Sequence, residues 1–192
     1  MRSDAVHLVS NTYGPRDWRP TPHGKQLALA ATGKLPFYVK DWTGEVVGIE
    51  DAATALLLAA EKGRNGERYI ISDRFMGVGE QYETAAEASG VKSPRFGIPL
   101  WAMYAMGYAG DVARIALRRD TVLSSRSVRL MHIWPTLDHT KAERELGWQP
   151  EPVHDSIRRA AQFYRANRRS RRWRRRGEKQ VAHYACPQRV PA

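Results

Sequence analysis

The sequence is poor in the features that build cross-links, metal centres and membrane spans. Cys186 is its only cysteine, which excludes an intrachain disulfide or a thiolate cluster and is typical of a reducing compartment. Its six histidines show no metal-ligand spacing such as His-x-x-x-His, so we expect no metal site. The longest apolar passage, 98–110, is shorter than the roughly 20 residues that a bilayer requires. No apolar segment of signal-peptide length is found at the amino terminus, so we expect a cytoplasmic protein without a membrane span.

The net charge of +11 is unevenly distributed along the 192 residues. Residues 165–192 contain ten of the 31 basic residues and one of the 20 acidic residues. That segment therefore carries +9 and residues 1–164 only +2. Residues 165–176 include eight arginines and leave no apolar face, which predicts a solvated, disordered tail. A hydrophobic content of 42% over the whole sequence is enough for a packed core. We expect one domain over 1–164 and a basic tail over 165–192.

The basic tail also offers a rival function. Its arginines, with Trp173 among them, could neutralise phosphates and stack on bases, which would give salt-sensitive binding of nucleic acid. Residues 1–164 contain no motif for nucleic-acid recognition. We therefore favour a solvated tail or a read-through product, and do not expect a nucleic-acid partner.

A turn-forming stretch at 11–17, Asn-Thr-Tyr-Gly-Pro-Arg-Asp, follows the short apolar run from Val6 to Val9. Gly14 permits a positive φ and Pro15 fixes φ near −65°. The pattern predicts a strand over 6–10 that ends in a tight turn. Such strand ends are where open α/β sheets bind their ligands.

The rest of residues 1–164 alternates between short apolar runs and helical patterns, which is typical of an α/β fold. We expect further strands at 35–40, 45–49, 68–72 and 95–98, the first two as a hairpin. We expect helices ending at Gly33 and over 52–62, 80–89, 99–118, 124–133, 139–146 and 153–164. The last of these has an apolar stripe made of Val153, Ile157, Ala160, Ala161 and Tyr164.

Three segments have a recognisable pattern: Tyr-Gly-Pro-x-Asp at 13–17, Ile-Glu-Asp-Ala-Ala at 49–53 and Asp-x-x-Lys-Ala-x-x-Glu-Leu-Gly-Trp-x-Pro at 138–150. Together they resemble the C-terminal half of the extended short-chain dehydrogenase/reductase family, the NAD-dependent epimerase/dehydratase group. Dihydroflavonol-reductase-like and 3β-hydroxysteroid-dehydrogenase-like members are the most similar. The resemblance covers about 6–165. It implies the C-terminal part of an NAD(P)-binding Rossmann-type fold with its small substrate domain, the first five strands missing.

The catalytic parts of that family are not found in this sequence. In the family, the amino-terminal half supplies a glycine-rich nucleotide loop and a Tyr-x-x-x-Lys pair, whose ammonium group lowers the tyrosine pKa towards neutral pH. None of the eight tyrosines here has a lysine four positions on, and neither Gly-x-x-Gly-x-x-Gly nor Gly-x-Gly-x-x-Gly occurs. We assign no catalytic residue and expect a truncated chain, inactive and without tight dinucleotide binding by itself.

The resemblance does imply residues at the edge of such a site. Family members usually carry a Pro-Ser pair against the nicotinamide carboxamide, and these places fall on Val9 and Ser10. Substrate-bordering positions are Tyr13 in the turn, and then Trp18, Arg19 and His23. For the last three, a surface loop is the alternative.

Two acidic residues stand where helices are expected to begin. A carboxylate at Asp51 could act as a general base, but Asp is a preferred N-cap residue and we favour that structural role. The same applies to Asp138, with Lys141 as its expected partner one helical turn on.

The apolar passage 98–110 leaves two alternatives open. It contains five large side chains, Trp101, Met103, Tyr104, Met106 and Tyr108. They could line a pocket for a flat apolar substrate such as a steroid or a flavonoid, or form a helix packed on the core.

The function implied by the resemblance is NAD(P)-dependent oxidoreduction or epimerisation of a hydroxyl- or keto-bearing small molecule. The cofactor of the complete fold would be NAD or NADP. Possible partners are the substrate, a second copy in a homo-oligomer, or a complementing N-terminal half. The alternative is an inactive fragment that binds only substrate or another subunit.

Overall fold

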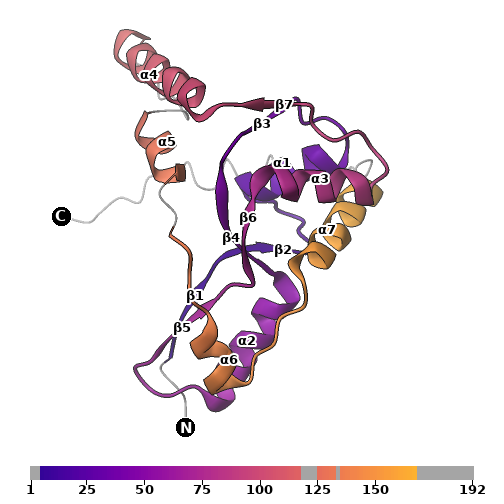
Figure 1. Ribbon diagram of the computed structural model, residues 1–192, viewed down its shortest axis with the longest axis vertical. Helices are drawn as coiled ribbons and strands as arrows, with labels where there is room; N and C mark the ends of the chain where they lie inside the picture. Colours follow the sequence, from indigo (N-terminus) through magenta and orange to yellow (C-terminus); the bar gives the residue numbers. More distant parts are fainter. Residues whose placement is uncertain (1–4, 118–124, 133–134, 168–192) are drawn as a thin grey trace, which may run out of the picture.

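A computed structural model describes residues 5–117, 125–132 and 135–167, and within these ranges the chain forms seven strands and seven helices (Figure 1). The strands are β1 (Val6–Val9), β2 (Asn11–Tyr13), β3 (Phe37–Val39), β4 (Thr43–Gly48), β5 (Arg68–Ile71), β6 (Arg74–Gly77) and β7 (Phe96–Ile98). The helices are α1 (Pro22–Ala31), α2 (Ile49–Lys62), α3 (Val78–Ala88), α4 (Leu100–Leu117), α5 (Ser125–His132), α6 (Thr140–Leu146) and α7 (Val153–Asn167). The predicted α/β class is confirmed; β2 and β6 were not predicted.

The strands pair in three small groups. β1 runs parallel to β5, with Val6 opposite Arg68. β4 lies between β2, to which it is parallel, and β6, to which it is antiparallel. β3 runs parallel to β7. The chain passes from the first group to the second at Ser10, which follows β1 and precedes β2 (Figure 1).

The predicted hairpin between 35–40 and 45–49 is wrong. Asp41 has a positive φ of 60°, and at this point the chain leaves β3 and enters a different group of strands. Before the turn, the Lys40 amide donates to the Ile98 carbonyl at 2.8 Å; after it, the Trp42 carbonyl accepts from the Val78 amide at 2.8 Å. Each strand therefore finds its partner far along the chain instead of across the short turn.

Strand β4 separates two hydrophobic cores, because successive side chains of a strand point to opposite faces. Val46 packs into the first core, with residues of α1, α3 and α7. Val47 packs into the second, with residues of α2, α6 and β5. The predicted stripe of the last helix is confirmed, since all five of its residues are buried in the first core. Figure 1 shows α1, α3 and α7 gathered together and α2 beside α6.

Asp51 does not cap α2, so that prediction is wrong. The helix begins two residues earlier, at Ile49, directly after Gly48, which forms no capping side-chain bond. Asp51 is buried, and its Oδ1 accepts a hydrogen bond from the Glu151 amide at 3.2 Å. Its main-chain oxygen accepts another from the Trp148 indole at 2.9 Å. The residue therefore anchors the segment that leads into α7.

Asp138 lies one residue before the cap of α6, which is His139. Its Oδ1 accepts from the Thr140 amide at 2.9 Å. Hydrogen bonding from the Thr140 side chain, and after it from the Thr140 amide, holds the pKa of the Asp138 carboxyl below its usual value. The expected pairing with Lys141 is wrong. The Lys141 ammonium instead contacts Glu67 Oε2 at 2.5 Å and lies 5.2 Å from the centre of the Tyr69 ring.

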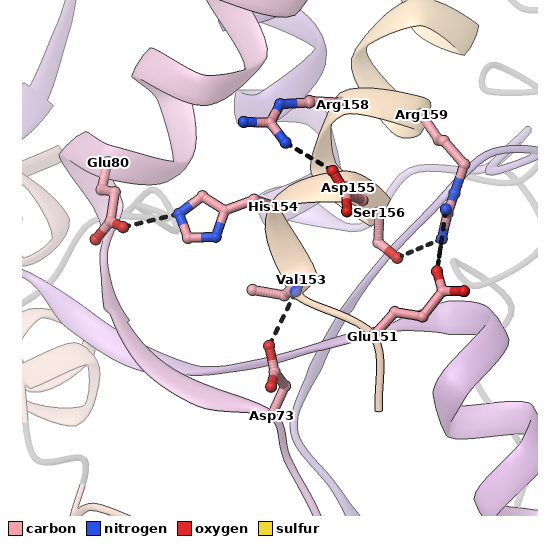
Figure 2. A network of polar contacts seen from close by, with 9 residues as sticks. All are labelled: Asp73, Glu80, Glu151, Val153, His154, Asp155, Ser156, Arg158 and Arg159. Carbon is pink, nitrogen blue, oxygen red and sulfur yellow. Dashed lines mark hydrogen bonds and ion pairs between the residues drawn. The ribbon is translucent and has the colours of Figure 1, made fainter. Parts of the chain in front are cut away.

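The start of α7 is held by a second carboxylate, from the turn between β5 and β6 (Figure 2). Asp73 Oδ2 accepts from the Val153 amide at 2.9 Å, which satisfies one of the free amide groups at the helix N-terminus. Beside it, His154 contacts Glu80 at 2.9 Å. The Arg159 guanidinium contacts Glu151 at 3.3 Å and donates to Ser156 at 2.9 Å.

Helix α4 packs against α5 and stands apart from α1, α3 and α7 (Figure 1). Trp101, Met106 and Tyr108 are exposed, so the alternative of a helix packed on the core is wrong for these side chains. Met103, in the first turn of α4, is half-buried and lines a hollow of about 350 Å³ together with residues of α1, β3 and α3. The start of α4 therefore approaches these elements, although the rest of the helix stands apart from them. Within the ranges given above, none of the helices is both long and apolar enough to cross a membrane.

The proposed boundary between domain and tail stays a prediction. Helix α7 continues through Arg165 to Asn167. The remaining arginine-rich residues, and with them the nucleic-acid hypothesis, lie outside the described residues.

Candidate functional site

A cleft of about 450 Å³ lies at the carboxyl ends of β1 and β2. The turn after β2 forms most of it, and α1, the first residue of α2 and the last turns of α7 close its sides. Its lining residues are Ser10, Asn11, Thr12, Tyr13, Gly14, Pro15, Arg16, Asp17, Thr21, His23, Ile49 and Tyr164. A cleft therefore lies at the end of the first strand, where the sequence predicted that a ligand would bind.

The turn approaches α2 so closely that only glycine fits at position 14. A Cβ atom on Gly14 would lie 1.9 Å from Ile49 Cγ2, well inside van der Waals contact. Arg16 has a positive φ of 67°, which is uncommon for a residue with a side chain. The turn is therefore fixed by close packing on the first residue of α2.

Hydrogen bonds tie the turn to α7 and position its polar side chains. The Tyr164 hydroxyl donates to Asp17 Oδ2 at 2.7 Å, and Asp17 Oδ1 accepts from the Arg19 amide at 3.2 Å. Thr21, the N-cap of α1, accepts from the Gly24 amide at 3.3 Å. Asp17 therefore connects the turn, the loop before α1 and α7.

The tyrosines of the cleft are hydrogen-bond donors and not bases. Tyr13 is buried and its hydroxyl donates to Gln81 Oε1 at 2.9 Å. Burial raises the pKa of Tyr13, and burial, together with the Asp17 carboxylate, raises the pKa of Tyr164. A proton-abstracting tyrosine needs the opposite shift. The cleft thus has groups for binding a polar ligand but no tyrosine poised for proton transfer.

Three of the six sequence-predicted site residues share this cleft. Ser10, Tyr13 and His23 line it. The Ser10 hydroxyl oxygen is buried and has no hydrogen-bond partner within the described ranges. His23 lies against Trp42, with ring centres 5.7 Å apart, and its burial lowers its pKa, which favours the neutral imidazole.

Val9, Trp18 and Arg19 do not line the cleft. Val9 is the last residue of β1 and pairs with Ile71. Trp18 packs edge-on against Phe163 with ring centres 4.8 Å apart. Among the residues that the structure describes, no group of three or more His, Cys, Asp or Glu side chains could hold a metal ion.

Sequence reasoning missed Asp17 and Tyr164 as a pair. Asp17 belongs to the turn motif at 13–17, and Tyr164 to the apolar stripe of α7. Nothing in the sequence connects positions 147 residues apart; a tyrosine ending a buried stripe signals only that its hydroxyl needs a partner.

Comparison with known proteins supports the resemblance given by the motifs. No protein-family model matches the chain. It is 28% identical over 154 residues to sterol demethylase protein B of Methylococcus capsulatus, a match that covers 79% of this chain and 47% of that protein. It is 24% identical over 160 residues to a putative dihydroflavonol 4-reductase of Synechocystis, covering 81% and 46%. The chain spans about half the length of these curated relatives.

Solved structures show the same fold. The crystal structure of gox2253 matches with a TM-score of 0.73 and 25% identity over 85% of this chain and 49% of that one. The Bordetella bronchiseptica enzyme WbmF, solved in complex with NAD+, matches with a TM-score of 0.61 and 19% identity over 93% and 50%. The fold is therefore that of Rossmann-type NAD-binding proteins. The chain is similar to about half the length of these proteins, which is consistent with the C-terminal portion of an extended short-chain dehydrogenase/reductase of the NAD-dependent epimerase/dehydratase group.

Proposed function

We propose that this chain forms the substrate-side portion of an NAD(P)-dependent oxidoreductase or epimerase that acts on a hydroxyl- or keto-bearing small molecule. The observation that carries the proposal is the cleft at 10–17, at the carboxyl ends of β1 and β2, each of which is paired in parallel with another strand. Such strand ends are where α/β enzymes bind their ligands. The names of the two curated relatives refer to a sterol and a dihydroflavonol. Both are ring systems that carry oxygen.

Ser10 is the residue in the cleft that best fits the nicotinamide end of the cofactor. Its buried hydroxyl has no partner in the described part of the chain, and an unpaired buried polar group costs free energy. A carboxamide oxygen would accept a hydrogen bond from this hydroxyl and so fix the orientation of the ring. When bound, the nicotinamide supplies the hydride chemistry, while the chain holds the ring and encloses the substrate.

The pyrophosphate of the cofactor has no matching site in this sequence, because the glycine-rich turn that binds it at a helix N-terminus is missing. Strand β1 pairs only with β5 among the described strands, and Val6, Leu8 and Val9 are exposed. A complementing N-terminal portion with the nucleotide loop and the Tyr-x-x-x-Lys pair would cover this apolar strand. Binding and turnover therefore need that portion.

The test is a fusion of the amino-terminal half of the Methylococcus capsulatus relative to the full 192-residue chain, titrated calorimetrically with NADH and NADPH. We expect the chain alone to show no low-micromolar binding and the fusion to bind one of the two. Ser10→Ala in the fusion should weaken binding by about two- to tenfold, the value of one hydrogen bond.

The control is Ser89→Ala, because Ser89 also has a buried, unpartnered hydroxyl but lies at the end of α3, outside the cleft. It should leave the dissociation constant unchanged. Low-micromolar binding by the chain alone, or a folded, monodisperse fusion that binds neither dinucleotide, would contradict the proposed division of the site.

A further inference from the structure

Helix α4 has an exposed apolar stripe along one face. The stripe consists of Trp101, Ala105, Tyr108 and Val112, spaced four, three and four residues apart, which places them on one side of a helix over a length of about 16 Å. Trp101 is 73%, Tyr108 61% and Val112 65% exposed, and Ala105 is also exposed. The part of the chain that the structure describes therefore leaves this stripe in contact with water.

The stripe lies on an outlying part of the molecule. Helix α4 packs against α5 and projects beyond α1, α3 and α7 (Figure 1). Asp111 connects the two helices, since its Oδ2 accepts from the Ser125 amide at 3.1 Å and from the Ser125 hydroxyl at 2.5 Å. Contiguous exposed apolar surface of this kind marks a site of contact with a partner protein or a membrane.

The surroundings of the stripe are basic. The described residues of α4 and α5 include three arginines, Arg114, Arg126 and Arg129, all of them exposed, against one acidic residue, Asp111. Hydrogen bonds from the Ser125 side chain and amide, and after them the charges of Arg114 and Arg126, hold the pKa of Asp111 below its usual value. Both arginines therefore lie near the junction of the two helices, and the α4–α5 pair has an excess of positive charge beside its apolar stripe.

This combination fits an anionic lipid surface better than a second copy of the chain. A second copy would bring the arginines of two α4–α5 pairs together, and like charges repel. Tryptophan and tyrosine combine an apolar ring with one polar group and are enriched at the level of the lipid headgroups. Helices with an aromatic apolar face and a basic polar face lie in the plane of that layer, which does not require the membrane-crossing length that the described helices lack.

We propose that the α4–α5 pair binds the surface of an anionic membrane, with Trp101, Tyr108 and Val112 entering the headgroup layer and the arginines attracting acidic lipids. The diameter of a helix, about 10 Å, is similar to the Debye length of about 8 Å at physiological salt. An arginine on the opposite side of α4 from the stripe, such as Arg114, is therefore still attracted by the lipid charge. This contact goes beyond the proposed function and needs neither cofactor nor a complementing half.

The first test measures, by flotation, how the full 192-residue chain partitions onto phosphatidylcholine vesicles with and without phosphatidylserine. We expect binding to the phosphatidylserine vesicles, and Tyr108→Glu should weaken it by about tenfold or more, because the apolar contact is lost and a negative charge approaches the lipid. Leu57→Glu is the matched control, since it adds the same charge to a helix at a side chain that is 68% exposed, but on α2. It should change the partition coefficient by less than about twofold. The arginine-rich sequence 165–176 would attract these vesicles through charge alone, and that attraction would respond equally to both glutamate variants.

A second pair of variants tests the arginines. Arg126→Ala should weaken binding to the phosphatidylserine vesicles by about fivefold and leave binding to pure phosphatidylcholine unchanged. Arg158→Ala removes the same charge from α7, where the Arg158 side chain is 53% exposed, and should have an effect of less than about twofold. An unchanged melting temperature shows that each variant is folded.

Insertion of the stripe is measured by tryptophan emission, which brominated acyl chains quench at short range. We expect brominated vesicles to quench the emission of the wild-type chain and Trp101→Phe to reduce that quenching. Trp18→Phe should leave it unchanged, because Trp18 packs on Phe163 of α7. Absence of partitioning, equal effects of the two glutamate variants, or equal quenching in Trp101→Phe and wild type would overturn the proposal. So would a dimer in sedimentation velocity that Tyr108→Glu dissociates, without binding to vesicles, because a second copy would then cover the stripe.

Discussion

Truncating Trp148 should remove a large part of the stability of the second core. The side chain is fully buried between α2 and α6, its indole donates to the Asp51 carbonyl at 2.9 Å, and its ring lies 6.3 Å from that of His139 in an edge-on arrangement. Truncation of a buried tryptophan to alanine costs about 3–5 kcal/mol, of which the lost hydrogen bond contributes about 1 kcal/mol. At about 2–4 °C per kcal/mol for a chain of this size, Trp148→Ala should lower the melting temperature by roughly 6–20 °C.

Guanidinium chloride unfolding followed by far-ultraviolet circular dichroism measures the change in free energy without relying on tryptophan emission. Trp101→Ala is the control: the substitution is the same, but Trp101 is 73% exposed and Trp148 is 0% exposed. The control should change the free energy of unfolding by no more than about 0.5 kcal/mol. Equal losses for the two variants would refute the assignment of Trp148 to a core and of Trp101 to the surface.

Two carboxylates at the start of α7 give further predictions. Burial raises the pKa of Asp51 above its ordinary 3.8, so the charged form of this side chain destabilises the folded protein. The destabilisation is zero below the unfolded-state pKa, where the carboxyl is protonated in both states, and reaches its full value above the folded-state pKa. Asp51→Asn should therefore stabilise the protein at pH 7 but not below about pH 4; a variant less stable at pH 7 would contradict this reasoning. Asp73→Ala should cost about 0.5–2 kcal/mol through the lost bond to the Val153 amide, whereas Asp155→Ala, which breaks an exposed pair with Arg158, should cost less than 1 kcal/mol in the same denaturation experiment.

The helices could be predicted from the sequence because the spacing of apolar residues that marks a helix repeats within a few positions. The stripe from Val153 to Tyr164 specified α7 and its buried face, and the glycines at 33 and 147 adopt the positive φ that ends a helix. Strand pairing was not predictable in the same way. Adjacent strands such as β3 and β4 suit a hairpin by spacing alone, and the choice of β7 as the partner of β3 depends on packing between distant segments.

The candidate site was predictable where it is formed by consecutive residues. Ser10 and Tyr13 reach the cleft because both belong to the strand end and turn. Trp18 lies in the same loop, but its ring packs on Phe163 of α7, a contact that no local pattern specifies. The helical pattern of α4 was read correctly, whereas its exposed tryptophan and tyrosine depend on where the helix docks.

The two anchors of α7 also determine the order in which the fold can be completed. Asp51 and Asp73 bind the segment 151–153 across 100 and 80 residues of chain. During translation these carboxylates leave the ribosome long before their amide partners. Neither core can be completed until the helices between 140 and 167, which cover the two cores, have been synthesised. Closing loops of this length is slow relative to local helix formation. Nascent chains should therefore expose Tyr69 until the residues of α6 are synthesised, and Leu27 until those of α7 are.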